Sequence, residues 1–297
     1  MHLMIPHASA LDEAARHALA GLNLPHLAAL LTRLSPAERW GSDEFAPHPP
    51  HDLALAALRG QSEPSVAAWA AEAGPELAWA LMTPVHLAVG TDGVDMLPPA
   101  ALQLAESDAA RLVDTLRPLW SEAEGWQWRV LNATTWLIGH ASALDGLQAA
   151  SIERVTGQAM EPWLPESRTL RRWQNEAQML LHGDALNAER EARGALVVNS
   201  VWISGLGRSS SEPPQLLQVD RRLSGPLLQG DLAGWLDAWQ QLDAGPLAEL
   251  AATPGPVSLT LAGERFAQRW TEQPLGWTQK LARRWRGVEP ARLLEAL

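Results

Sequence analysis

The 297-residue chain contains no cysteine and no tyrosine, and Lys280 is its one lysine. The absence of cysteine excludes disulfides, thiolate metal sites, iron–sulfur clusters and a cysteine nucleophile. The absence of tyrosine excludes a phenol as a catalytic acid or nucleophile. Histidine remains as an acid, base or ligand, but no histidine follows His182.

The sequence also lacks a long apolar run. The longest nearly apolar stretch, Leu77 to Gly90, is too short to span a bilayer and contains Pro84 and His86. Residues 1 to 6 have no basic flank and do not resemble a signal peptide. The formal net charge of -11 disfavours polyanionic partners. We therefore expect a cytoplasmic protein with no nucleic-acid and no membrane partner.

Tryptophan, in contrast, is abundant: the chain has 15 Trp and 2 Phe. Buried indoles imply rigid packing, and each buried indole N–H needs an acceptor. A contiguous exposed group of tryptophans would instead indicate a protein-interaction module, because tryptophan is a frequent anchor of interfaces.

Strand-like and helical segments alternate along the whole chain. Strands are expected at residues 2 to 6, 196 to 203 and 257 to 261, and helices at 11 to 20, 25 to 34, 167 to 182, 185 to 193, 232 to 242 and 276 to 286. This alternation predicts an α/β fold with a mostly parallel central sheet flanked by helices. Residues 126 to 138 predict a small antiparallel accessory element. We expect one α/β domain, 1–297, with an accessory subdomain around 77–140.

The helix expected at 167 to 182 has two distinct faces. Its polar stripe consists of Arg171, Gln174, Asn175, Gln178 and His182. Neutral amides suit either a buried structural network or contact with a ligand, and the pattern does not distinguish the two. His182 stands at the helix C-terminus, where a cation interacts favourably with the helix dipole, so a structural role is as well supported as catalysis.

A glycine-containing loop follows the strongest expected strand. Backbone N–H groups of Gly205 and Gly207, with Arg208, would suit a phosphate or carboxylate. An ordinary exit from a strand explains the same residues. The run is not a dinucleotide fingerprint, because Ser210 stands where a third glycine belongs. Asn199, inside the apolar strand, must find partners, since an unpaired buried amide costs about 1 to 3 kcal/mol.

Residues 181 to 207 resemble a segment of the archaeal-type cofactor-independent phosphoglycerate mutases. The run Leu181-His182-Gly183-Asp184-Ala185-Leu186-Asn187-Ala188-Glu189-Arg190-Glu191-Ala192-Arg193-Gly194 precedes an apolar strand that ends in Gly205-Leu206-Gly207. Those enzymes belong to the alkaline-phosphatase-like superfamily. The whole chain is also similar to a proteobacterial phosphoglycerate mutase-like family, the RpfE-type regulatory proteins. The residues that carry this second likeness are Thr83-Pro84-Val85-His86, Arg172-Trp173-Gln174-Asn175 and Leu259-Thr260-Leu261-Ala262.

The sequence differs from the mutases at the positions of their metal ligands and nucleophile. The resemblance implies two metal ions held by Asp and His, and a Ser or Thr nucleophile. Gly263-Glu264-Arg265 stands where the late Asp-His pair belongs, and residues 1 to 10 lack the early Asp. An arginine places a fixed cation where a metal ion is required. We therefore expect no catalytic residue, no metal and no cofactor.

Our leading hypothesis is an alkaline-phosphatase-like pseudoenzyme that works as a regulatory protein or binds a small phosphorylated or carboxylated metabolite, with a protein partner as a further option. Two alternatives stay open. One is an active metal-dependent phosphoglycerate mutase or phosphohydrolase with ligands among His2, His7, His86 and His182; the other is an interaction module with exposed tryptophans. The expected ligand contacts are Gln174, Asn175, Gln178, His182, Asn187, Arg190, Asn199, Gly205, Gly207 and Arg208.

Overall fold

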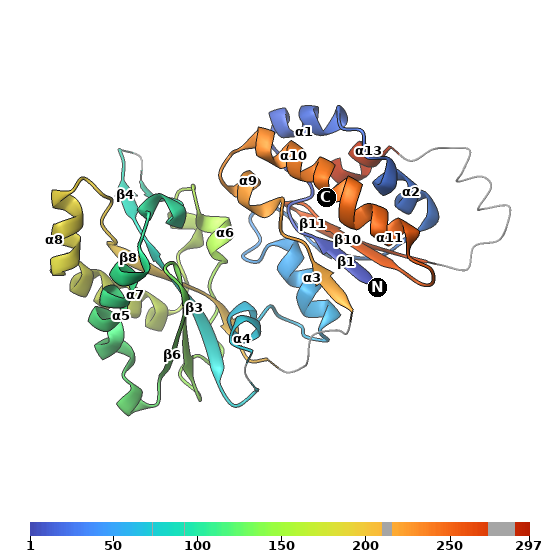
Figure 1. The fold of residues 1–297 in the computed structure, drawn as a ribbon. Coiled ribbons are helices and arrows are strands. Elements are labelled where there is room, and N and C mark those ends of the chain that lie inside the picture. The colour runs from blue at the N-terminus through green and yellow to red at the C-terminus, as the bar shows by residue number, and fades with distance from the viewer. Residues whose placement is uncertain (73, 92, 210–215, 273–288) are drawn as a thin grey trace. The chain divides into compact units, whose positions relative to one another are not determined.

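A computed structural model describes residues 1–72, 74–91, 93–209, 216–272 and 289–297 (Figure 1). Its contacts divide the chain into two compact units: unit 1 is Met1–Arg59 with Pro213–Leu297, and unit 2 is Gly60–Glu212. The expected subdomain around 77–140 falls wholly within unit 2. A single α/β domain stays a prediction, because contact density does not measure whether a unit folds alone. The helix expected at 276 to 286 lies outside the described residues.

Unit 1 is built on a five-stranded sheet of order β2-β11-β10-β1-β9. The strands are β1 (His2–Ile5), β2 (Ser35–Gly41), β9 (Leu217–Val219), β10 (Ser258–Ala262) and β11 (Phe266–Thr271). β1 runs parallel to β9 and β10, whereas β11 is antiparallel to both β10 and β2. The α/β prediction is confirmed, but a mostly parallel sheet is wrong. The link from β10 to β11, residues 263–265, is too short for the crossover that a parallel pair requires.

Helices cover both faces of this sheet (Figure 1). They are α1 (Glu13–Ala20), α2 (Pro25–Arg33), α3 (Pro50–Leu58), α9 (Ser224–Leu228), α10 (Leu232–Leu242), α11 (Ala248–Ala252) and α13 (Pro290–Glu295). Leu3 and Ile5 of β1 pack with Trp235 and Trp239 of α10 in one buried core. Because alternate strand residues face opposite sides, this pattern fixes which face of β1 meets α10.

Unit 2 contains an antiparallel four-stranded sheet of order β6-β7-β3-β8, and a separate hairpin of β4 and β5. The strands are β3 (Ala78–Val85), β4 (Leu87–Val89), β5 (Val94–Met96), β6 (Gln127–Asn132), β7 (Thr135–His140) and β8 (Ser200–Gly207). The antiparallel pair expected at 126 to 138 is therefore β6 with β7, and it belongs to the main sheet of unit 2. β8, which overlaps the strand expected at 196 to 203, lies at the end of the strand order and is antiparallel to β3.

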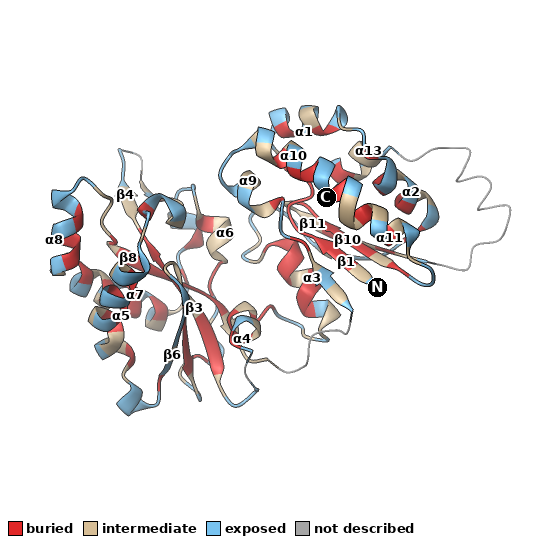
Figure 2. Ribbon diagram, in the orientation of Figure 1, coloured by how far each residue is buried: buried red, intermediate tan, exposed pale blue. Residues whose placement is uncertain are grey.

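The longer helices of unit 2 are α5 (Glu106–Leu116), α7 (Arg168–His182) and α8 (Ala185–Ala192), and the short ones are α4 (Val66–Ala70) and α6 (Ile152–Val155). The Ser167 side chain accepts from the Leu170 N–H and caps α7. Figure 2 shows that β3 and β8 are largely buried, whereas β6 and the outer faces of the helices are exposed. No helix among these residues is long and apolar enough to cross a bilayer.

Ten of the tryptophans are buried, and Trp40, Trp69 and Trp128 are half-buried. In one buried cluster Trp173 packs edge-on against Trp120 and Trp126. The indole N–H groups of Trp79, Trp120, Trp136 and Trp239 have no hydrogen-bond partner in the described parts of the chain. The expectation that each buried indole finds an acceptor is therefore wrong for four of them, where packing determines the side-chain position.

Candidate functional site

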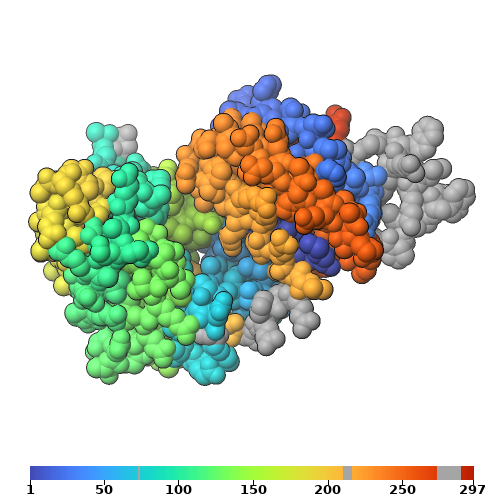
Figure 3. All heavy atoms as spheres, in the orientation of Figure 1, coloured from blue at the N-terminus to red at the C-terminus, as the bar shows by residue number. Residues whose placement is uncertain are grey.

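Two adjoining hollows border α7 in unit 2. The smaller has a volume of about 200 Å³, and Arg171, Gln174, Asn175, Gln178, Ser200 and Trp202 are among its lining residues. The larger is an open groove of about 1020 Å³ that reaches α8, which forms part of the outer surface of unit 2 (yellow in Figure 3). Both hollows are lined by Leu87, Met160, Asn175 and Gln178. The structure thus brings the amide stripe of α7 to a cavity wall.

Gln174 is the most unusual member of this wall. Its side chain is 8% exposed, and it makes no hydrogen bond to any described residue. The neighbouring Gln178 differs, because its Nε2 donates to Ser200 Oγ at 3.2 Å. Asn175 is exposed on the same wall. Its amide atoms are not among the fully buried, unpaired polar atoms of the described residues, so they face the cavity and are accessible to a ligand there.

Arg171 contributes a positive charge to the smaller hollow. Its guanidinium forms no ion pair within the described ranges, whereas the next residue, Arg172, lies 3.7 Å from Glu176. The sequence prediction named Arg171 in the stripe but omitted it from the expected ligand contacts. Its helical spacing from Gln174 and Gln178 was the signal that would have included it.

Other charged groups lie in the larger groove, where His182, Asp184 and Glu191 are among the lining residues. Asp184 caps α8 by accepting from the Leu186 N–H at 2.8 Å, and its other oxygen accepts from Thr115 Oγ1 at 2.6 Å. His182 is exposed at the end of α7, as the helix-dipole interpretation expects.

Asn187 and Asn199 also line the larger groove, but backbone groups satisfy both amides. Asn187 Nδ2 donates to the carbonyls of Leu181 and Val198, and its Oδ1 accepts from the Val198 N–H. Asn199 exchanges two bonds with the backbone of Leu87, at 2.7 and 2.9 Å. The partners that Asn199 was expected to need are present. Both residues hold the chain in place, and their role as ligand contacts stays a prediction that these bonds do not favour.

Arg190 lies away from both hollows, although the sequence analysis placed it among the ligand contacts. It is 1% exposed and pairs with Asp108 at 3.2 Å. Its other donors reach the carbonyl oxygens of Leu196 and Leu102. A buried arginine with these three partners anchors α8.

Gly205, Gly207 and Arg208 lie at the end of β8 and also line neither hollow. A Cβ on Gly207, whose φ is +152°, would lie 2.3 Å from Ser65 Oγ. Arg208 binds Asp145 and the carbonyl oxygens of Pro75, Glu76 and Ala141. Close packing and internal pairing account for these residues, which favours the ordinary strand exit over an anion-binding loop.

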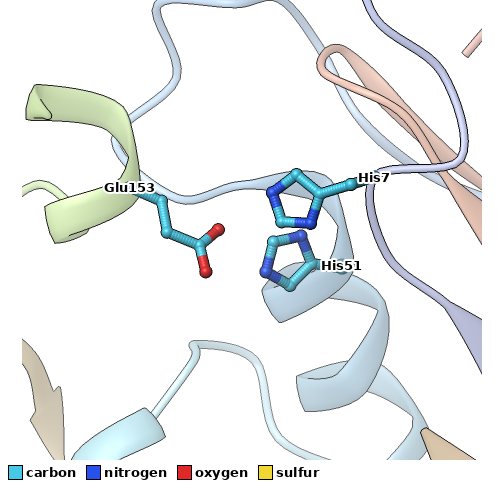
Figure 4. A group of neighbouring side chains, drawn as sticks. All are labelled: His7, His51 and Glu153. Carbon is cyan, nitrogen blue, oxygen red and sulfur yellow. The ribbon is translucent and has the colours of Figure 1, made fainter. Parts of the chain in front are cut away.

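Unit 1 contains a second notable group, the buried histidines His7 and His51, with ring centroids 5.1 Å apart (Figure 4). His7 Nδ1 lies 2.9 Å from Ser224 Oγ, and its φ of +58° is unusual for a residue with a side chain. Figure 4 also draws Glu153, a residue of α6 in unit 2. His7 is one of the potential ligands named from the sequence, and His51 is a buried residue of α3.

Two other potential metal ligands, His2 and His86, have structural partners. Burial lowers the pKa of His2 to about 4, with smaller contributions from Arg269 and the N-terminus. His2 Nε2 shares a 2.8 Å hydrogen bond with Thr260 Oγ1, and His86 Nδ1 with the Val197 carbonyl at 2.8 Å. These two imidazoles serve the fold of units 1 and 2 respectively.

None of the tryptophans within the described ranges is exposed. The 13 described tryptophans therefore offer no exposed anchor for an interaction module, and Trp277 and Trp285 lie outside the described residues.

Comparison with known proteins gives distant likenesses only. No family model matches the chain, and no curated protein matches it significantly. Similar solved structures include a cofactor-independent phosphoglycerate mutase from Thermoplasma acidophilum DSM 1728, with 12% identity, a TM-score of 0.36 and coverage of 92% of this chain and 90% of that chain. Another is the PH0037 protein from Pyrococcus horikoshii, with 11% identity and a TM-score of 0.47. The match covers 91% of this chain and 86% of that chain. At TM-scores below 0.5, neither likeness establishes a shared fold or activity.

Proposed function

We propose that this chain is a binding protein for a small organic anion, a carboxylate or a phosphate ester, held in the smaller hollow of unit 2. The observation that carries the proposal is Gln174, a residue only 8% exposed on the cavity wall, which makes no hydrogen bond to a described residue. Its amide atoms stay accessible from the cavity, so a ligand there gains their hydrogen bonds without displacing a protein partner.

Arg171 and Gln178 complete the proposed contacts. The Arg171 guanidinium supplies two parallel donors for a carboxylate or phosphate, and the amides of Gln174 and Gln178 fix the orientation. The volume of about 200 Å³ suits a compact anionic group. The lining side chains offer donors and a cation but no nucleophile paired with a base, which favours binding over turnover.

We further propose descent from a cofactor-independent phosphoglycerate mutase, with loss of the metal site and a regulatory role in the cytoplasm. This rests on the sequence resemblance of residues 181 to 207 and on Gly263-Glu264-Arg265 at the position of the late metal ligands. Membership of the RpfE-type family rests on the same kind of resemblance.

Isothermal titration of the full chain tests the binding proposal with glycerol 3-phosphate and butanoate as anions, and with glycerol and butanamide as their neutral counterparts. Only the anions are expected to bind. Arg171→Gln is expected to weaken binding by about 10-fold or more, since a hydrogen bond to a charged group contributes about 1.5 to 3 kcal/mol. Arg172→Gln, which removes a neighbouring cation outside the hollow, is the matched control. Equal affinities for the two variants, or no binding at millimolar concentrations, would contradict the proposal.

A metal-dependent mutase or phosphohydrolase is the second candidate. The pair of buried imidazoles, His7 and His51, favours it, because imidazole is a common metal ligand. Two ligands are fewer than the three or four that zinc sites usually have. Metal analysis of the purified protein, with phosphoglycerate mutase and phosphatase assays, decides this point. Stoichiometric metal with metal-dependent turnover would replace the binding proposal with an enzyme.

A further inference from the structure

Exposed apolar side chains gather around the two hollows of unit 2. Val89 of the β4–β5 hairpin is 84% exposed and Met179 of α7 is 77% exposed, and both line the larger groove. Leu164, 43% exposed, lines the smaller hollow. Scattered apolar residues on a surface need no explanation, but a group that lines one cavity indicates a binding surface.

The two hollows adjoin each other beside α7. Leu87, Met160, Asn175 and Gln178 line both. A ligand whose charged end lies beside Arg171 would therefore extend past these shared residues into the groove. At about 1020 Å³ the groove is at the upper end of the range for small-molecule sites, about 300 to 1,000 Å³, and far exceeds the needs of an anionic group alone.

The charged side chains of the larger groove disfavour a second anionic group on the ligand. Asp184 and Glu191 supply two carboxylates against the single imidazole of His182. A second anionic group at this end would be repelled, whereas an apolar chain would cover Val89 and Met179. Methionine suits such a chain because its unbranched side chain adapts to irregular shapes.

We infer that the ligand is an amphipathic anion: a carboxylate bound by Arg171 and Gln174, with an unbranched apolar chain that extends along the groove over Met179 and Val89. The inference rests on the proposed anion site and adds the chemical class of its ligand. Asn175 and Gln178, which line both hollows, would contact the ligand where its carboxylate joins its apolar chain.

A chain-length series tests this inference by isothermal titration of the full protein with acetate, butanoate, hexanoate and octanoate, all below their micellar concentrations. Affinity is expected to rise about twofold per methylene, or roughly 16-fold from butanoate to octanoate. A twofold rise corresponds to about half of the free energy expected when a methylene is fully buried. Met179→Ser and Val89→Ser are expected to reduce this gain, measured as the ratio of octanoate to butanoate affinity in each variant. Val130→Ser is the matched control, since Val130 is an exposed residue of β6 that lines neither hollow.

The outcomes separate the two proposals. If butanoate binds in an Arg171-dependent manner but octanoate binds no more tightly, the amphipathic ligand is overturned and the anion site stands. If Val130→Ser reduces the rise in affinity from butanoate to octanoate as much as Met179→Ser does, the apolar chain of the ligand does not lie in the groove. The inference is then overturned as well. If no carboxylate in the series binds but glycerol 3-phosphate does, the amphipathic carboxylate is overturned and the anion site stands; if neither binds, the proposed function itself fails.

Discussion

At the scale of single residues, the polar side chains around α7 and β8 differ in whether their hydrogen bonds are complete. Asn187 has three bonds to backbone groups, and Asn199 has two. Gln174 has none to a described residue, although it is almost as buried as Asn187. Complete bonding marks a structural amide, and the missing partner of Gln174 marks the group that a ligand would meet.

Asn187→Ala tests the structural assignment. The substitution removes bonds to Leu181 and Val198 and leaves buried backbone groups unsatisfied, so we expect a loss of about 2 to 4 kcal/mol in the free energy of unfolding. Urea denaturation measures it. Asn175→Ala, at an exposed amide, is expected to stay within about 0.5 kcal/mol of the wild type. Equal effects of the two substitutions would refute a structural role for Asn187.

His2 predicts a pH dependence of stability. Burial holds its pKa at about 4 in the folded state, below the ordinary 6.5, so the unfolded chain binds more protons between these values. Its contribution to stability is present above pH 6.5 and is lost as the pH falls towards 4. The loss amounts to at most about 3 kcal/mol, and partial solvent exposure reduces it. His2→Asn should flatten the decline in urea midpoint between pH 6.5 and 4.5; a slope identical to that of the wild type would show that His2 does not titrate in this way.

The sequence identifies the amide stripe but not which polar residues are structural. A spacing of three and four residues suffices to place Gln174, Asn175 and Gln178 on one face of α7. Arg190 is different, because its partner Asp108 lies 82 residues away. Helical periodicity shows which side of a helix a residue occupies, but a long-range ion pair follows only from the tertiary fold.

At the scale of elements, α7 is the best-predicted part of the chain and the sheets are the least. The expected helix at 167 to 182 matches α7, Arg168–His182, since apolar spacing and the Ser167 cap agree. The sheet of unit 1 is mixed because β11 returns immediately after β10, and no signal marked residues 266–271 as a strand. Strand direction depends on the length of such connections, which short apolar runs do not reveal.

Packing between elements predicts the effect of a methyl group on Gly139. A Cβ there would lie 2.8 Å from the Trp79 ring, between β7 and β3. Gly139→Ala is expected to lower the free energy of unfolding by about 1 to 3 kcal/mol through overpacking. Gly183→Ala, with no atom within 4 Å of the added Cβ, is the control. If Gly139→Ala leaves the free energy of unfolding unchanged, β3 and β7 accommodate the added methyl group without strain.

At the scale of the whole molecule, the chain leaves unit 1 near residue 59 and returns near 213, so unit 2 is one continuous segment. Unit 2 has its own antiparallel sheet and its own core, which contains Trp120, Trp136 and Trp173. The sequence analysis expected a single domain because helices and strands alternate throughout. Alternation does not show which strands share a sheet.

Unit 2 is therefore expected to fold when residues 60–212 are produced alone. The segment should give a cooperative urea transition and dispersed amide resonances, because its core is formed from its own residues. A segment that stays unfolded under native conditions would instead favour the single α/β domain that the sequence predicts.

The central claim is that an anionic ligand binds the Gln174 amide on the cavity wall, and one NMR measurement tests it most directly. In the full chain, the side-chain amide resonance of Gln174 is assigned by its loss in Gln174→Leu and followed during titration with butanoate. The account predicts a saturable shift of this resonance, absent with butanamide and greatly weakened in Arg171→Gln. A Gln174 resonance that stays unmoved while butanoate saturates the protein would contradict the account.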